Sequence, residues 1–533
     1  MTPTAHDPGT SSPDTSPAWQ LRPSEYLATL DLGEGEYIVW NRFSPVPTLL
    51  NETALEILHG AIEGFSREEL EQCRALFLER KLAYEGESDP SQARFVANID
   101  EYTHNLREKD ESSKTFYSNL QLTNDPCNVG CTYCMIPAFN NGAKELVKLG
   151  KKPPPPRAGL SREEKLERIK KVLDQYIQTH LDAGAPEMII GMGGGEILAQ
   201  WSVVKGVIEY ATERYPEARI RWSMNSSLTI LTEEQAAFLA KHGVDIHTSI
   251  DGYKENHDKY RAYHNGKGTF DDVLEGIERY NEHSPEHAIT AFQGTIAKAD
   301  EFDANEMFEF VTSKFEGARM APNLLGVSVE EGEKQADLMM DLKIAGEKLG
   351  FNFGDTIFEH MNAAINARGN RRFSLYCIAM TNAKEHSHVA VNISTMQASR
   401  SCSFVPSANV SLDELDYDLF NKKLWDQNVE FAEERAETIK KNCMSCEIAG
   451  LCHGSCVLNG IDGNNQMNPA GCAYLRRLWR RLVAHLHNRG DRIPSQTRIP
   501  VVFDKQPAST PESAHATSTS ASMEIASSAE AAS

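Results

Sequence analysis

The sequence predicts an α/β protein with a small α+β unit before a parallel sheet and a cysteine-rich region after it. From Phe116 onward, strand-like runs alternate with helix-like segments, which in one chain indicates parallel strands joined by crossover helices. Capping boxes begin two of these helices, and a glycine follows each of the two. Ten of the 11 cysteines fall into two groups, one after the first predicted strand and one near the C-terminus.

Six runs of apolar and β-branched residues define the predicted sheet. Six strand-helix units suit a partial (β/α)6 barrel better than a closed eightfold one, and catalytic groups then belong at the carboxyl ends of the strands. Ser161 with Glu164 and Thr232 with Gln235 form the two capping boxes. The predicted strands are Phe116–Thr123, Glu187–Gly191, Ile220–Asn225, Val244–Ile250, Ile289–Ile296 and Leu324–Val329.

The segments outside the sheet follow other patterns. A strand-like run at Tyr37–Trp40 and helical periodicity at Thr53–Ile62 and Arg67–Phe77 predict the α+β unit, and the charged segment 98–114 predicts a linker or an exposed helix. Both chain ends are rich in Ser, Thr, Pro and Ala, so they bury too little apolar surface to fold. The predicted divisions are residues 1–16 (disordered tail), 17–110 (N-terminal unit), 111–335 (partial barrel), 336–490 (cysteine-rich domain) and 491–533 (disordered tail).

The charge and hydropathy of the 533-residue chain exclude several classes of partner. With 76 acidic and 54 basic side chains the net charge is -22, which argues against nucleic acid and anionic membranes as partners. The N-terminus has neither the basic start nor the apolar core of a secretory signal, and no apolar run is long enough to span a bilayer. We therefore expect a cytoplasmic protein. Its cysteines stay reduced there, so metal or cluster ligands are the first interpretation of the clustered cysteines and disulfides are the second.

The first cysteine group directly follows the first predicted strand. Cys127, Cys131 and Cys134 have Cys-x3-Cys-x2-Cys spacing on one loop. Since a closed [4Fe-4S] cluster takes four cysteines, three thiolates leave one iron open for chemistry. A zinc knuckle lacking one ligand is the alternative. Cys73 stands alone on an amphipathic helix, where a buried, small apolar role is the simplest interpretation.

This loop resembles the cluster motif of the radical S-adenosylmethionine (SAM) enzymes, including the aromatic Tyr133 before the last cysteine. The next predicted strand runs into Gly194, Gly195 and Glu196, which resemble the Gly-Gly-Glu segment that receives the amino group of SAM in that family. Glycines permit close backbone approach, and a carboxylate can pair with an ammonium group. The resemblance thus implies a SAM-binding [4Fe-4S] cluster and bound SAM.

Two further strand ends match the same family. Asn225 lies in a segment that resembles the family's Thr-Asn-Gly-Thr, and Ser249 begins a Ser-Ile-Asp-Gly segment similar to one in its peptide- and protein-modifying members. The resemblance implies that Ser249 contacts the SAM ribose or carboxylate, and Asn225 is a second candidate. For Asp251 and Arg261, an ion pair that stabilises the loop is at least as good an interpretation as a functional role.

The C-terminal cysteines resemble the SPASM extension of radical SAM enzymes, which carries two auxiliary [4Fe-4S] clusters. Their core has Cys-x2-Cys-x5-Cys-x3-Cys spacing and a trailing cysteine. Cluster I would then have three cysteines, so either His386, His388 or Glu385 closes it or it is open to substrate; two zinc sites are the alternative. The resemblance implies that auxiliary cluster I is held by Cys377, Cys402 and Cys456, and auxiliary cluster II by Cys443, Cys446, Cys452 and Cys472.

The resemblance implies a reaction in which the reduced cluster cleaves SAM to a 5'-deoxyadenosyl radical that abstracts hydrogen from a substrate. It implies a ribosomally made precursor peptide or a protein as substrate, and a low-potential electron donor such as ferredoxin or flavodoxin. A sulfatase-maturating enzyme is the alternative, although such enzymes place Asp after the second SPASM cysteine and here Ser403 follows Cys402. A non-catalytic iron-sulfur electron carrier would not need the Gly-Gly-Glu and Ser-Ile-Asp-Gly segments.

Two features remain open between a functional and a structural role. The N-terminal unit, residues 17–110, either positions a leader peptide or caps the barrel. The arginines of one predicted helix either contact an acidic leader or form a solvated face. These arginines are Arg476, Arg477, Arg480 and Arg481.

Overall fold

The structure is a computed structural model, and it describes most of the chain between residues 21 and 488. Both predicted disordered tails lie outside the described residues. None of the helices in the described part is long and apolar enough to cross a membrane. The described residues are 21–108, 119–124, 127–134, 160–184, 187–315, 319–324, 328–349, 358, 361, 373–375, 388–399, 409–456 and 460–488.

A nine-stranded sheet forms the centre of the larger part of the molecule. Its strand order is β11-β10-β9-β8-β7-β6-β12-β13-β14, so the strands from β6 to β11 follow one another in chain order. All five pairings among these six strands are parallel, as the strand-helix alternation predicts. The strands are β6 (Asn119–Asn124), β7 (Met188–Gly194), β8 (Ile220–Asn225), β9 (Asp245–Ser249), β10 (Ala291–Ile296) and β11 (Arg319–Leu324).

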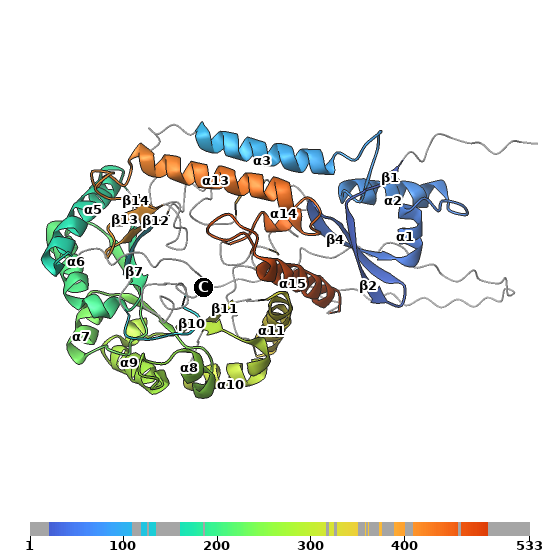
Figure 1. Ribbon diagram of the computed structural model, residues 1–533. Coiled ribbons are helices and arrows are strands. Elements are labelled where there is room, and N and C mark those ends of the chain that lie inside the picture. Colours follow the sequence, from blue (N-terminus) through green and yellow to red (C-terminus); the bar gives the residue numbers. More distant parts are fainter. Residues whose placement is uncertain are drawn as a thin grey trace, which may run out of the picture.

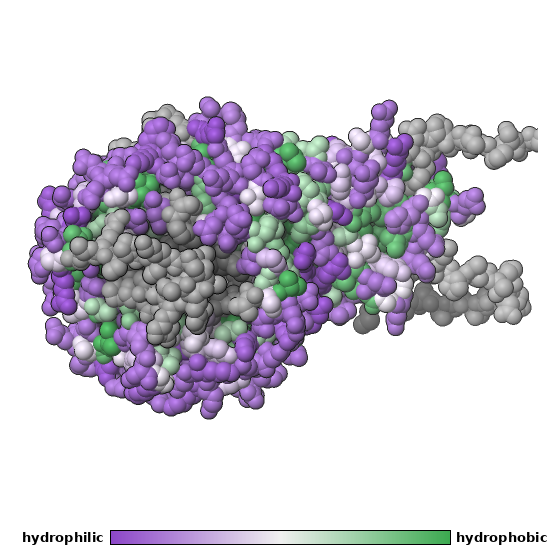
Figure 2. Space-filling view, viewed as in Figure 1, coloured by the Kyte–Doolittle hydropathy of each residue, from purple (hydrophilic) through white to green (hydrophobic). Residues whose placement is uncertain are grey.

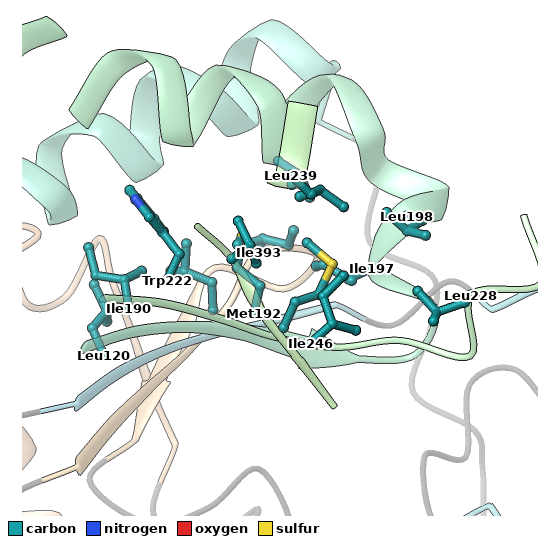
Figure 3. Close-up of a cluster of buried hydrophobic side chains, with 14 of the residues drawn as sticks. Leu120, Ile190, Met192, Ile197, Leu198, Trp222, Leu228, Leu239, Ile246 and Ile393 are labelled. Atoms are coloured by element: carbon teal, nitrogen blue, oxygen red, sulfur yellow. The ribbon is translucent and has the colours of Figure 1, made fainter. Parts of the chain in front are cut away.

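Helices line the outer side of this sheet in an arc (Figure 1). Alternate residues of the strands, such as Leu120, Ile190 and Trp222, are buried beneath these helices. Figure 3 shows them between the sheet and the helices, facing Leu239 of α7. Figure 2 shows that hydrophilic side chains dominate the outer rim. The helices are α5 (Arg162–Asp182), α6 (Trp201–Arg214), α7 (Glu233–Lys241), α8 (Lys254–Tyr260), α9 (Phe270–His283), α10 (Ala304–Lys314) and α11 (Val329–Lys348).

The predicted α/β class and the helix starts are confirmed. Ser161 and Thr232 each accept a hydrogen bond from the backbone of the third helical residue, whose side chain bonds back, as in a capping box. The predicted strand Leu324–Val329 is wrong, because β11 ends at Leu324 and Val329 already begins α11. The Ser328 side chain accepts the backbone N–H of Glu331, so a helix cap stands where the apolar run predicted a strand.

A hairpin that the sequence analysis did not predict extends the sheet beyond β6. β12 (His388–Asn392) runs parallel to β6, β13 (Gln397–Ser399) pairs with β12 antiparallel, and β14 (Val410–Ser411) pairs with β13. β12 and β13 lie between the positions of Cys377 and Cys402 in the chain, and β14 follows Cys402. The long segment between these cysteines therefore joins the C-terminal region to the sheet that carries the first cysteine loop.

The N-terminal unit is an α+β structure, as predicted, with more strands than the sequence indicated. Its sheet has the order β2-β3-β4 and is antiparallel, with β1 and β5 as a separate pair. The predicted helix Thr53–Ile62 ends four residues early, at Leu58, before Gly60 with its φ of +98°. The elements are β1 (Arg22–Pro23), β2 (Leu27–Gly33), β3 (Glu36–Asn41), β4 (Ser44–Asn51), α1 (Glu52–Leu58), α2 (Arg67–Glu79), β5 (Ala83–Tyr84) and α3 (Ser91–Arg107).

The start of the charged segment 98–114 belongs to α3, which packs on the C-terminal region. Phe95, Ile99, Tyr102 and Leu106 form a buried face of α3, so this part is neither a linker nor a fully exposed helix. α3 lies beside α13 (Figure 1), and the ion pair between Arg107 and Glu433 joins the two helices. The C-terminal helices are α13 (Lys422–Asn442), α14 (Ala449–Cys452) and α15 (Pro469–Asn488).

The N-terminal sheet also docks directly on the cysteine-rich region. The Trp40 Nε1 donates to the Glu447 carbonyl at 2.8 Å, and the Trp40 ring meets Trp479 of α15 edge to face, with 6.2 Å between ring centroids. The Gly450 N–H donates to the Arg42 carbonyl at 2.8 Å. These contacts join the N-terminal unit to the segment that carries four of the cysteines.

We expect Gly450→Ala to loosen this docking. A Cβ atom at Gly450 would lie 2.2 Å from the carbonyl oxygen of Phe43, so one backbone must move. Such overpacking costs about 1–3 kcal/mol. Hydrogen exchange should then be faster in β3, β4 and α14 of the variant than in the wild type. Exchange at the wild-type rate would contradict this view of the interface.

Candidate functional site

The predicted SAM-contacting residues lie at the carboxyl ends of three neighbouring parallel strands. Gly194 ends β7, with Gly195 and Glu196 next in the chain. Asn225 ends β8 and is exposed, and Ser249 ends β9 and is half-buried. Because the strands are parallel, these residues lie along one edge of the sheet, the same edge from which the cysteine loop leaves β6.

Two glycines of β7 leave room for polar side chains on the face of the sheet opposite the helices. A Cβ at Gly191 would lie 2.2 Å from Oε1 of Gln121, on β6. A Cβ at Gly193 would lie 3.2 Å from Gln121 Nε2 and 3.3 Å from Asn225 Cβ. Gln121 and Asn225 therefore approach each other across a strand with no side chain between them, and sequence analysis did not single out Gln121.

Glu196 ties the end of β7 to the loop after β8. It is buried, with 1% of its surface exposed. Its Oε1 accepts from Leu198 N at 3.0 Å and from Ser226 Oγ at 2.7 Å, and its Oε2 accepts from the backbone and hydroxyl of Ser227 at 2.8 and 2.5 Å. Four internal donors therefore satisfy this carboxylate. The contact with the SAM amino group stays a prediction, and the observed partners Ser226 and Ser227 were not predicted.

The first cysteine loop, residues 127–134, is anchored on the last residue of α8 and on the segment that follows this helix. Gly130 N donates to the Ala262 carbonyl at 2.7 Å, and Thr132 N donates to the Tyr260 carbonyl at 2.9 Å. A ring nitrogen of His264 lies 3.2 Å from the Cys127 carbonyl. Residues about 130 positions apart thus fix the loop that carries the three thiols, and nothing in the spacing of the sequence indicates this anchor.

Asp251 and Arg261 form an ion pair, which is the structural role that the sequence analysis weighed for them. The Asp251 side chain is fully buried, and Arg261 Nε and Nη2 each lie 3.2 Å from one of its oxygens. The same carboxylate accepts the Tyr133 hydroxyl and, at 2.8 Å, the Thr295 N–H. Desolvation raises the pKa of Tyr133 well above its usual value, so the phenol stays protonated as the donor. This network joins the cysteine loop to β10.

His257 accepts a hydrogen bond from the backbone of Asp251 and so contacts the same network. Burial lowers its pKa to about 4, so the ring is neutral at pH 7. Its Nδ1 accepts the Asp251 N–H at 3.3 Å, which leaves Nε2–H to donate to Thr269 Oγ1 at 3.0 Å. The Thr269 hydroxyl in turn donates to the Arg261 carbonyl.

Cys127, Cys131 and Cys134 fit a cluster whose iron atoms neutralise their thiolates. Burial raises the pKa of Cys127 to about 12 and raises that of Cys131, and a negative charge on a neighbouring cysteine raises them further. Such thiols ionise at neutral pH only beside a strong positive charge. No three described His, Cys, Asp or Glu side chains are placed to hold one metal ion. In a four-iron cube each thiolate binds a different iron, so convergence on one point is not required.

Four cysteines of the C-terminal region also lie close together, and we call them the four-thiol group. Burial raises the pKa of Cys443 to about 12 and that of Cys452 well above its usual value, and the other thiols add to both shifts. Cys443 directly follows α13, and α15 carries the last cysteine of the group. The group consists of Cys443, Cys446, Cys452 and Cys472, the set that the resemblance implies for auxiliary cluster II.

Part of the predicted auxiliary cluster I cannot be placed. Cys456 is described and half-buried, whereas Cys377 and Cys402 lie outside the described residues. So do Glu385, His386, the side chain of His388 and Ser403. Cys73 is fully buried, as expected of a core residue.

Three of the four arginines of α15 belong to ion pairs within the chain. Arg477 pairs with Asp337 of α11 at 2.9 Å, and Arg480 pairs with Glu447. Arg481 pairs with Asp337 and Asp341, whereas Arg476 is exposed. Most of this charge therefore holds α15 against neighbouring elements.

The comparison with known families agrees with the geometry of this edge. Residues 124–302 match the family described as the radical SAM superfamily. The chain carries a radical SAM domain. The matched region begins at the last residue of β6, contains the cysteine loop and ends just after β10, so it holds every predicted SAM contact.

Relatives of the radical SAM domain include enzymes that modify other molecules. A serine-type anaerobic sulfatase-maturating enzyme from Bacteroides thetaiotaomicron is 26% identical over 257 residues, 46% of this chain and 57% of that protein. The radical SAM cyclopropyl synthase TigE from Paramaledivibacter caminithermalis is 20% identical over 397 residues, 69% of this chain and 74% of that protein. The chain thus spans little more than half of the first relative's length.

A solved structure has the same fold. The structure described as native anSMEcpe with bound AdoMet and Cp18Cys peptide superposes with a TM-score of 0.51 and 18% identity, over 70% of this chain and 98% of that one. The superposed part is longer than the matched region, residues 124–302. A radical SAM domain implies a [4Fe-4S] cluster and SAM, and the loop and strand ends described above supply thiols and polar groups for both.

Proposed function

We propose that this protein is a radical SAM maturase that modifies a ribosomally made peptide. The observation that carries the proposal is the placement of three thiols, one buried and two half-buried, on one anchored loop, at the sheet edge that also carries Gly194, Asn225 and Ser249. A [4Fe-4S] cluster bound there would supply the electron that cleaves SAM. The chain's own part is to fix the loop through the Asp251 network and to offer the exposed Asn225 and half-buried Ser249 to SAM.

The test is a SAM-cleavage assay on protein reconstituted with iron and sulfide under a strong reductant. We expect 5'-deoxyadenosine and methionine in equal amounts. Their absence from protein with a fully loaded cluster would exclude both enzyme functions and leave the electron carrier. Coupled to a candidate peptide, the same assay identifies the substrate.

We further propose that the cysteine-rich region is a SPASM domain with two auxiliary [4Fe-4S] clusters. The four-thiol group supports auxiliary cluster II, because four mutually close thiols provide a closed ligand set. Cys456 with Cys377 and Cys402 would hold auxiliary cluster I. These clusters would accept the electron released when a substrate radical is oxidised, with ferredoxin or flavodoxin as the external electron donor.

We expect Cys443→Ala and Cys472→Ala to separate SAM cleavage from product formation. Each change removes one ligand of the four-thiol group and leaves the radical SAM loop intact, so 5'-deoxyadenosine should form at more than half of the wild-type rate. Modified peptide should be lost at least tenfold. Equal loss of both products in either variant would contradict separate roles for the two sites.

The N-terminal unit is the proposed binding site for the precursor peptide. β2 is an edge strand of its sheet, and an extended peptide can add to such an edge through backbone hydrogen bonds. The contacts of Trp40 and Gly450 hold this sheet against the cysteine-rich region, so a peptide bound at the edge is held by the same body that carries the clusters.

A sulfatase-maturating enzyme is the second candidate, and the relative from Bacteroides thetaiotaomicron favours it. Its substrate would be a protein with an active-site Cys or Ser. The residue after Cys402 is Ser403, where the sulfatase-maturating group has Asp, and this favours the peptide. Incubation of the reconstituted enzyme with peptides from a sulfatase, followed by mass spectrometry, decides between the two functions, because oxidation of Cys or Ser to formylglycine gives a distinct mass.

We propose that the protein works in the reducing cytoplasm.

A further inference from the structure

A buried arginine links the helix before the four-thiol group to the loop between its third cysteine and Cys456. Arg435 belongs to α13, and none of its surface is exposed. Its Nη2 donates to the carbonyls of Gly454, Ser455 and Ile461 at 2.9, 2.8 and 2.8 Å. Its Nη1 donates to the Asp462 carbonyl at 3.2 Å. One guanidinium therefore holds four carbonyl groups.

The loop that it holds has an unusual backbone. His453, Gly454 and Ser455 have successive φ angles of +46°, +80° and +54°. Residues other than glycine rarely adopt this left-handed region, so neighbouring contacts must impose it. The hydrogen bonds from Arg435 to the carbonyls of Gly454 and Ser455 are such contacts. They fix the path of the chain from Cys452 to Cys456.

Arg435 also acts electrostatically on the four-thiol group. It lies on α13, eight residues before Cys443, which directly follows the helix. The carbonyls of Gly454 and Ser455 that its guanidinium holds lie two and three residues after Cys452, so its positive charge lies close to this cysteine of the group. Arg435 is shielded from solvent, so salt screens this interaction little.

We propose that Arg435 is a positioning residue that fixes the loop between Cys452 and Cys456 and raises the reduction potential of the cluster on the four-thiol group. Reduction adds negative charge to a cluster, and a buried positive charge nearby stabilises the reduced form. This inference rests on the proposed auxiliary clusters. It goes beyond them by naming the residue that sets the potential of one cluster and its placement relative to Cys456.

The experiment compares Arg435→Gln and Arg435→Lys in the full chain, with Arg477→Gln as the matched control on the surface of α15. Each protein is reconstituted, its iron is counted, and the potentials of its clusters are measured by redox titration followed by electron paramagnetic resonance. Lysine keeps the charge but cannot reach four carbonyls, and glutamine removes the charge. SAM cleavage is measured in parallel to report on the separate radical SAM loop.

We expect Arg435→Gln to lower the potential of the auxiliary cluster, Arg435→Lys to lower it less, and Arg477→Gln to leave it unchanged. The potential of the SAM-binding cluster should stay constant in all three. Equal potentials in Arg435→Gln and the wild type would overturn the electrostatic part of the inference. Full auxiliary iron with an unchanged potential in Arg435→Lys would overturn the loop-fixing part, since lysine retains the charge but not the four hydrogen bonds. A wild type with about four irons per chain would instead refute the auxiliary clusters themselves.

Discussion

Replacement of Cys127, Cys131 and Cys134 by alanine should abolish SAM cleavage and leave the C-terminal clusters in place. The three thiols lie on a loop fixed by Ala262 and Tyr260, and the four-thiol group lies on other elements. Iron per chain should fall from about twelve to about eight, because one four-iron cube is lost. Iron analysis and the amount of 5'-deoxyadenosine formed under strong reductant check the two parts.

Cys73→Ala is the matched control, since Cys73 is a fully buried cysteine of the N-terminal core. Burial raises its pKa to about 11, so it stays a thiol, and its loss should change neither iron content nor cleavage. Persistent formation of 5'-deoxyadenosine by the triple variant would contradict the assignment of the cluster loop. A loss of all twelve irons would show that the two regions do not bind iron independently.

The sequence predicts the parts of this molecule that depend on local patterns. The capping box at Ser161 depends on residues three apart, and the strand Ile220–Asn225 is bounded as predicted. The order of the sheet follows from the right-handed strand-helix alternation, which leaves few other arrangements. The spacing of Cys127, Cys131 and Cys134 likewise predicts the cysteine loop, because three thiols this close in the chain can bind one cluster from a single loop.

Contacts between distant segments are what the sequence could not show. Nothing in the pattern around Trp40 indicates a hydrogen bond to Glu447, more than 400 residues away. α13 has the composition of an ordinary charged helix, so the sequence does not single out Arg435. Only the folded structure shows that its side chain donates to four carbonyls. The predicted strand Leu324–Val329 is wrong because a short apolar run has no periodicity that distinguishes a strand from a helix. The N-cap at Ser328 begins α11 there instead.

Asp251→Asn should strongly destabilise the part of the chain that is built around the nine-stranded sheet. Asp251 is fully buried and Arg261 is 12% exposed, so the variant leaves a positive charge in the interior without its counterion. Removing one partner of a buried pair costs about 3–5 kcal/mol of the free energy of unfolding. Urea denaturation followed by circular dichroism measures the loss. Hydrogen exchange should locate it at Thr295, whose N–H donates to Asp251.

Asp271→Asn is the matched control, because Asp271 pairs with Lys254 on the surface of the same part of the chain and is 72% exposed. A surface pair contributes about 0–1 kcal/mol, so this variant should unfold close to the wild type. The double variant Asp251→Asn with Arg261→Met should recover part of the loss, since it removes the stranded charge together with its partner. If Asp251→Asn costs no more than Asp271→Asn, the network does not anchor the cysteine loop. SAM cleavage would then depend on the loop's backbone contacts to Tyr260 and Ala262 alone.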